Sequence, residues 1–197
     1  MSTALLAALA RNNAFANRRI GAALARLSAA EFAAARTGFF PSLFETANHV
    51  LEVDLYYLDA LEGGGRGRAV FDDFRPHHDP VVLAAAQGEA DRRLVAFCDG
   101  LGEADLARRV PTDRGPGRIV PERVDALLLH LFQHQIHHRG QLHAMLAGTA
   151  VAPPQLDEWL LDHDAEARLA DEADLGLSGG VPPVAAAPEG PSPVRAR

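Results

Sequence analysis

Cysteine and aromatic residues are scarce in this chain of 197 residues. Cys98 is the only cysteine, so no intramolecular disulfide can form, which fits a reducing compartment. Aromatic residues make up 6% of the chain, and alanine and leucine supply most of its apolar residues. Because alanine and leucine have the highest helix propensities, this composition predicts a mainly helical protein.

Long apolar runs and basic stripes are missing as well. No run approaches the roughly 20 apolar residues needed to cross a bilayer. The segment from Met1 to Ala10 is apolar, but no basic segment precedes it, so we interpret it as the start of a helix and not as a signal peptide. The formal net charge of -7 argues against binding to nucleic acid or to an anionic membrane. We expect a cytoplasmic protein.

Apolar residues recur at helical spacing in four segments. The predicted helices run from about Thr3 to Leu27, Ser42 to Leu61, Pro80 to Leu101 and Pro121 to Leu146. Ser28 followed by Glu31 is typical of a capping box for a short extra turn, and Asp79 is a typical cap before the third segment. Glycine follows the second, third and fourth segments, as is typical of helix ends. Four helices of this length predict an all-α fold, a four-helix bundle. The stretch around Val110 and Ile119 has extended character, but no sheet is predicted.

The C-terminal part differs in composition from the bundle. Gln155 to Leu161 is predicted to form a short helix that docks on the bundle. Residues 163–197 are first acidic and then rich in proline, glycine and alanine, and such a segment buries too little apolar surface to fold. The predicted organisation is therefore a bundle over residues 1–162 and a mostly disordered tail over 163–197.

Histidines occupy core positions on two of the predicted helices. His134 and His138 are separated by four residues, so they lie one turn apart on the apolar face of the fourth helix. His49 lies on the inward face of the second helix, and Tyr56, which shares that face, is predicted to line the pocket. Three imidazoles on two facing helices can hold one divalent ion and leave coordination positions open. The alternative is that these histidines are neutral, hydrogen-bonded core residues.

Neighbouring residues refine this hypothesis. Gln135 stands where the metalloprotease pattern H-E-x-x-H requires glutamate as a base, so a metalloprotease is not expected. Gln141 lies about 20° from His134 around the helix and is predicted to line the pocket as a polar partner of the ligands. Arg139 points away and is expected to anchor a neighbouring element or a carboxylate. Gly140 is expected to permit close helix packing.

The pattern of residues from His134 to Gln141 makes the chain resemble the DinB (damage-inducible protein) family of DinB/YfiT-like metalloenzymes. The segment from His134 to Gln141 is similar to the family signature H-x-x-H-H-R-G-Q, and segments beginning at Asn12, Asn48 and Ala152 are similar to further family patterns. The resemblance implies an up-down-down-up bundle and a metal held by His49, His134 and His138. His137 is then a neighbour of the ligands and not a ligand.

The resemblance also suggests a reaction. Relatives include transferases and isomerases that use a low-molecular-weight thiol, so we expect a divalent ion (zinc, nickel or iron) and a transfer between such a thiol and a small electrophile. A metal ion can lower the pKa of a thiol and so supply a thiolate at neutral pH. A non-enzymatic metal-binding stress-response protein and a hydrolase using metal-bound water are the alternatives.

A second apolar face on two helices predicts a homodimer. It carries, on the second and fourth predicted helices, Phe44, Leu51, Leu55, Leu58, Leu129, Phe132 and Ile136. A helix in a monomeric bundle needs one apolar stripe only, so an exposed second stripe favours a partner copy. The alternative is that the segments around Phe71 or Trp159 cover it.

Overall fold

The computed structural model describes residues 2–165, 168, 169, 171 and 173. Four long helices dominate it: α1 (Thr3–Leu24), α3 (Leu43–Glu62), α5 (Pro80–Asp99) and α6 (Val124–Leu146). Two short helices, α2 (Ala29–Ala33) and α4 (Ala69–Asp73), and two 3-10 turns, η1 (Glu103–Ala107) and η2 (Asp162–Asp164), lie between or after them. The predicted four-helix bundle is confirmed, and most of the predicted disordered tail lies outside the described residues.

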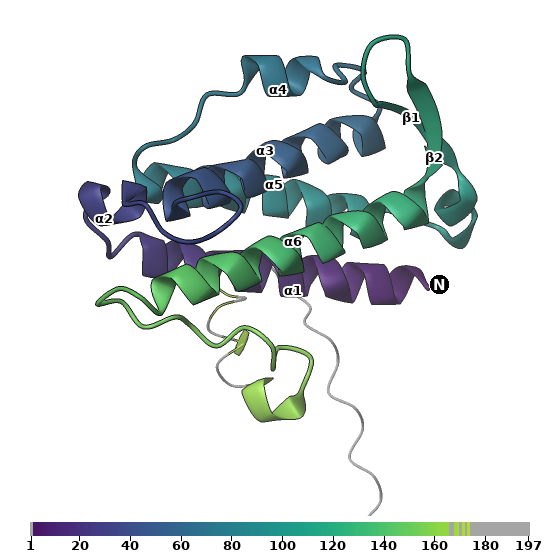
Figure 1. The fold of residues 1–197 in the computed structure, drawn as a ribbon. Helices are drawn as coiled ribbons and strands as arrows, with labels where there is room; N and C mark the ends of the chain where they lie inside the picture. Colours follow the sequence, from purple (N-terminus) through teal and green to yellow (C-terminus); the bar gives the residue numbers. More distant parts are fainter. Residues whose placement is uncertain (1, 166–167, 170, 172, 174–197) are drawn as a thin grey trace, which may run out of the picture.

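The helices follow the up-down-down-up order that the family resemblance implied. In Figure 1, α1 and α6 run in one direction and α3 and α5 in the other. Packed pairs connect α1 to α5, α5 to α3, α3 to α6 and α6 back to α1, which closes the ring around the core. Because α3 and α5 are parallel, residues 63–79, including α4, return along the bundle between them. Within the described part of the chain, no helix meets the length and apolarity that a membrane span requires.

Local capping explains where the helices begin and end. The Ser42 and Asp79 side chains accept hydrogen bonds from the first turns of α3 and α5, and Pro80 opens α5. Ser28 and Glu31 form the expected capping box at α2. Gly63 ends α3 with a φ of 77°, a left-handed conformation that glycine adopts without strain. These boundaries agree with the sequence pattern to within about one turn.

A β-hairpin corrects the prediction that the chain contains no sheet. Strands β1 (Arg109–Asp113) and β2 (Ile119–Arg123) pair antiparallel, and the turn between them uses Gly115 and Gly117 at positive φ. Pro111 lies opposite Pro121, so the two residues without an N–H share one position of the ladder. Because β2 continues to Arg123, α6 begins three residues later than expected.

The segment after the bundle also differs from the prediction. Residues 155–161 form turns and irregular structure, not a helix. The segment nevertheless docks on the bundle, because Trp159 is 1% exposed and its ring centroid lies 6.4 Å from that of Phe15 on α1. One large buried ring anchors it without regular backbone structure.

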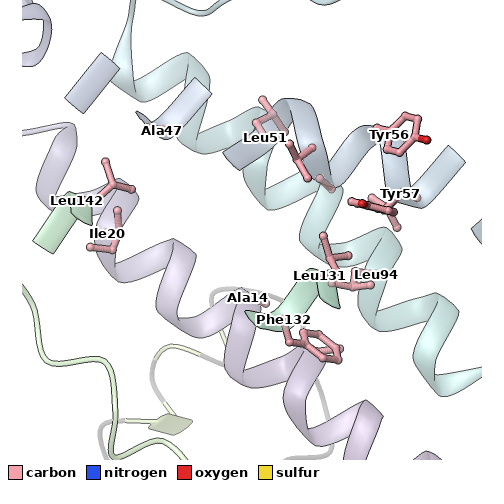
Figure 2. Close-up of a cluster of buried hydrophobic side chains, with 14 of the residues drawn as sticks. Ala14, Ile20, Ala47, Leu51, Tyr56, Tyr57, Leu94, Leu131, Phe132 and Leu142 are labelled. Atoms are coloured by element: carbon pink, nitrogen blue, oxygen red, sulfur yellow. The ribbon is translucent and has the colours of Figure 1, made fainter. Parts of the chain in front are cut away.

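Leucine, alanine and aromatic side chains from the long helices fill the core. Figure 2 shows Leu51 and Tyr57 of α3, Leu94 of α5 and Leu131 and Phe132 of α6 within it. Leu51, Leu58 and Phe132 are no more than 4% exposed, although their stripe predicted a dimer surface. The chain itself buries this stripe because α3 also contacts α2, α4 and β1. Ile136 keeps 58% exposure, and the homodimer stays a prediction.

A hydrogen-bonded network of polar side chains crosses this core and joins all four long helices. Its members are Asn13 and Asn17 of α1, Asp54 of α3, Gln87 and Asp91 of α5, and Gln135 and Arg139 of α6, all buried.

Arg139 is the hub of this network. Its Nη1 donates to the side-chain oxygens of Asn13, Asn17 and Gln135. Gln135 in turn donates to Asp54, and both asparagines donate to Asp91, at 3.1 and 2.9 Å. Arg139 therefore anchors neighbouring helices as expected, and amide groups stand between it and the carboxylates.

Burial perturbs the ionisable members of the network. It raises the pKa of Asp54 to about 7, assisted by the neighbouring Asp91 carboxylate. It raises the pKa of Asp91 to about 6 and lowers that of the Arg139 guanidinium to about 10. The largest cause of all three pKa shifts is burial, since each charged form loses hydration in the core.

The expectation that Gly140 permits close helix packing is wrong, because no neighbouring helix among the described residues approaches this position. A Cβ atom built there meets no described atom within 4 Å. At Gly21 of α1, by contrast, a Cβ would lie 2.9 Å from the Cβ of Ala84 on α5. Close helix contact therefore depends on Gly21.

We expect Gly140→Ala to raise the free energy of unfolding by about 0.5–1 kcal/mol, because alanine favours the helix and has space at this position. Gly21→Ala, the matched control, should lower it because α1 and α5 must separate. Urea denaturation of both variants measures the difference. A destabilised Gly140→Ala protein would mean that this position is packed after all.

Candidate metal centre

Three histidine rings converge between α3 and α6. These helices pack side by side and antiparallel, so His49 of α3 faces His134 and His138 of α6. One ring nitrogen from each histidine lies within 4.8 Å of the other two. The ring centroids of His134 and His138 are 4.4 Å apart, as expected for adjacent turns of one helix face. The structure thus brings together the three residues proposed from the sequence.

The spacing of the nitrogens fits metal ligation. Nε2 of His134 lies 3.2 Å from Nε2 of His49. Two ligands of a tetrahedral ion, each about 2.0–2.1 Å from it, are about 3.3 Å apart. Nδ1 of His134 is buried and has no hydrogen-bond partner among the described residues. The donor set therefore fits a divalent transition metal ion.

The rings are held in the neutral form that metal ligation requires. Burial, together with the neighbouring histidines, lowers the pKa of His49 to about 4 and that of His134 to about 3. Burial also lowers the pKa of His138, and the hydrogen bond that His138 donates to Gln141 opposes this shift. Neutral imidazole is the ligand form, so protons compete for this site only in acid.

Neighbouring side chains orient the rings. Nδ1 of His138 lies 2.8 Å from Oε1 of Gln141, to which it donates, and this leaves Nε2 of His138 unprotonated. Nε2 of Gln141 lies 3.1 Å from Nε2 of His137, which fixes the orientation of the amide. Nδ1 of His49 lies 3.9 Å from Oε2 of Glu52, on the side away from His134. Gln141 and His137 thus stand beside the ligands, where the sequence analysis placed them.

Phe40 covers one side of the histidine cluster. Its ring centroid lies 4.3 Å from that of His49 and 5.8 Å from that of His138. It belongs to the connection between α2 and α3, which approaches α6 so closely that a Cβ at Gly38 would lie 2.5 Å from Cε of Met145. Phe40 was not predicted to belong to the site, and the only signal for it in the sequence is the pair of adjacent aromatic residues Phe39 and Phe40 in a connection.

Tyr56 does not line the cluster, which corrects its assignment to the pocket. Its hydroxyl donates to the carbonyl oxygen of Asp113, and its ring stacks on Phe71 with centroids 4.7 Å apart. Tyr56 lies seven residues after His49, about 10 Å along the helix. Its side chain therefore supports the hairpin and α4.

The comparisons identify the family. A bundle with histidines on α3 and α6 defines a class of helical candidate metal-binding proteins, and the DinB family model matches residues 1–172. The chain belongs to the DinB family.

One solved structure agrees with this assignment. It is a DinB-like protein of Bacillus subtilis, YjoA, which is similar with a TM-score of 0.52 and 24% sequence identity, over 74% of this chain and 95% of that one. At this identity the likeness shows the fold alone. No curated protein matches the chain significantly.

The lowered pKa values predict metal binding that resists acid. Three histidines with ordinary pKa values near 6.5 lose roughly a thousandfold in affinity between pH 7.5 and 5.5, because each is protonated over that range. With pKa values of about 4 and 3 at His49 and His134, we expect less than about tenfold. Zinc competition titrations at both pH values measure this, and a thousandfold loss would contradict it.

The hydrogen bond that His138 donates to Gln141 predicts a second effect. Gln141→Ala should lower zinc affinity about 10–100-fold, because His138 loses the acceptor that fixes its tautomer. Gln133→Ala, an exposed position on the same helix, should leave the affinity unchanged. Equal affinities in the two variants would show that Gln141 does not orient the ligand.

Proposed function

We propose that this DinB-family protein binds one divalent transition metal ion (zinc, nickel or iron) through His49, His134 and His138. We further propose that it transfers a low-molecular-weight thiol to a small electrophile. The supporting observation is the convergence of three neutral imidazoles within 4.8 Å. Three protein ligands leave positions for a substrate, the arrangement that distinguishes catalytic from closed structural sites.

The chemistry divides between the ion and the chain. A bound divalent ion supplies a Lewis acid that lowers the pKa of a thiol, so that a thiolate exists at neutral pH. Gln141 holds the His138 ring, and Phe40 excludes water from one side of the cluster. Cys98 is unsuited as a nucleophile, because it is 1% exposed and burial raises its pKa to about 12.

The proposed partners follow from the same reasoning. They are a small electrophile and a thiol, in a cytoplasmic protein with neither nucleic acid nor membrane as partner. The formal charge of -7 supports the exclusion of nucleic acid. The first alternative is a non-enzymatic metal-binding stress-response protein, in which the ion stabilises the packing of α3 on α6 and takes part in no reaction. The second alternative is a hydrolase.

Cobalt(II) replacing the native ion provides a direct test. We expect a thiol such as glutathione to produce a sulfur-to-cobalt charge-transfer band, because the sulfur enters an open position. His134→Ala should abolish metal binding and the band, whereas His143→Ala, on the opposite side of α6, should keep both. Turnover of a thiol with an electrophile should stop on chelation and return on adding metal. If adding a thiol does not change the absorption spectrum of the cobalt-loaded protein, the result favours the non-enzymatic alternative.

A further inference from the structure

A second cleft lies on the side of α6 opposite the histidines. It has a volume of about 710 Å³, within the range of small-molecule sites. Ile136, Gly140 and His143 of α6 line it, and at 100° per residue they lie roughly 180° around the helix from His134 and His138. Its other walls come from α1 and from residues 153–157. The cleft is therefore separate from the candidate metal centre.

The walls combine apolar and polar groups. The apolar surface consists of Ala16, Ile136, Pro153, Pro154 and Leu156. Arg139 and His143 are the basic lining side chains, while Asp157 accepts a hydrogen bond from Gln155 at 2.8 Å. Ile136 is an apolar side chain beside this cleft, and it is 58% exposed. Such a surface suits a molecule with one polar end and an apolar body.

Arg139 supplies the most specific feature of the cleft. It is 6% exposed, and buried guanidinium groups are normally paired with a carboxylate. Within the described residues it forms no ion pair, and its Nη1 donates to amide oxygens of Asn13, Asn17 and Gln135. Nε and Nη2 donate to no described residue. A buried cation with unused donors in a cleft wall fits an anion.

Gly140 gives an independent observation. Glycine inside a helix costs about 1 kcal/mol relative to alanine, and no described atom lies within 4 Å of the position of a Cβ there. The position lines the cleft. Glycine widens the cleft at the turn that follows Ile136, which gives a ligand access to the α6 backbone.

We propose that this cleft binds a small amphipathic carboxylate. The carboxylate accepts hydrogen bonds from Arg139 and lies near His143, and the apolar body rests on Ile136, Leu156 and the prolines. Charge-assisted hydrogen bonds to guanidinium are among the strongest that a carboxylate makes. The site uses none of the three histidines, so it does not depend on the proposed metal chemistry.

Octanoate and the neutral octanamide are matched probes for the full-length, metal-loaded protein. We expect octanoate to bind at least tenfold more tightly by calorimetry, and NMR shifts to centre on Ile136 and Gly140. Gly140→Leu should weaken octanoate binding at least tenfold by filling the cleft, whereas Gln133→Leu, exposed on the same helix and outside the cleft, should not. Octanoate binding should persist in His134→Ala, which separates it from carboxylate binding to the metal.

Three results would overturn the proposal. One is equal affinity for the two probes or no binding of octanoate. Another is an effect of His134→Ala that matches that of Gly140→Leu. The third is a combination of two findings: the parent protein does not bind octanoate, and the sedimentation coefficient of Gly140→Leu differs from that of the parent. That combination would identify the cleft as an interface between two copies of the chain.

Discussion

A guanidinium group in the interior sets the rotation of α6, and the candidate metal centre depends on that rotation. Nη1 of Arg139 must reach the asparagines of α1 and the amide of Gln135, because a buried charge without hydrogen-bond partners costs several kcal/mol. His138 is the preceding residue, so its direction follows at about 100° around the helix. With Arg139 directed to α1, His134 and His138 face α3.

The parts of the site that lie on one helix could be predicted from the sequence. The four-residue spacing of His134 and His138 fixes their common face, and the same geometry places Gln141 beside them. His49 required one further assumption, that its helix packs against the last one. The serine, aspartate and glycine caps fixed most helix ends, because capping is a local interaction between neighbouring residues.

The missed features depend on contacts between distant segments. The stretch around Val110 and Ile119 was not predicted to form a sheet. A hairpin forms there and accommodates Pro111 and Pro121, because these two residues lie opposite each other in the ladder. The position of Phe40 depends on how a connection folds over α6. Periodicity within single helices could not show that Arg139 meets amides of α1. The prediction of close helix packing at Gly140 was wrong because a glycine in the sequence does not show whether another helix lies beside it.

The ligand set also has a topological consequence. His49 and His134 are separated by 85 residues, whereas His134 and His138 are joined by one turn of helix. An ion held by all three is a cross-link that closes a large loop, and closing such a loop in an unfolded chain costs about 4 kcal/mol of conformational entropy. In the folded bundle, burial of the apolar core already offsets this loss of conformational entropy. Ligation by all three histidines would therefore require the packing of α3 on α6.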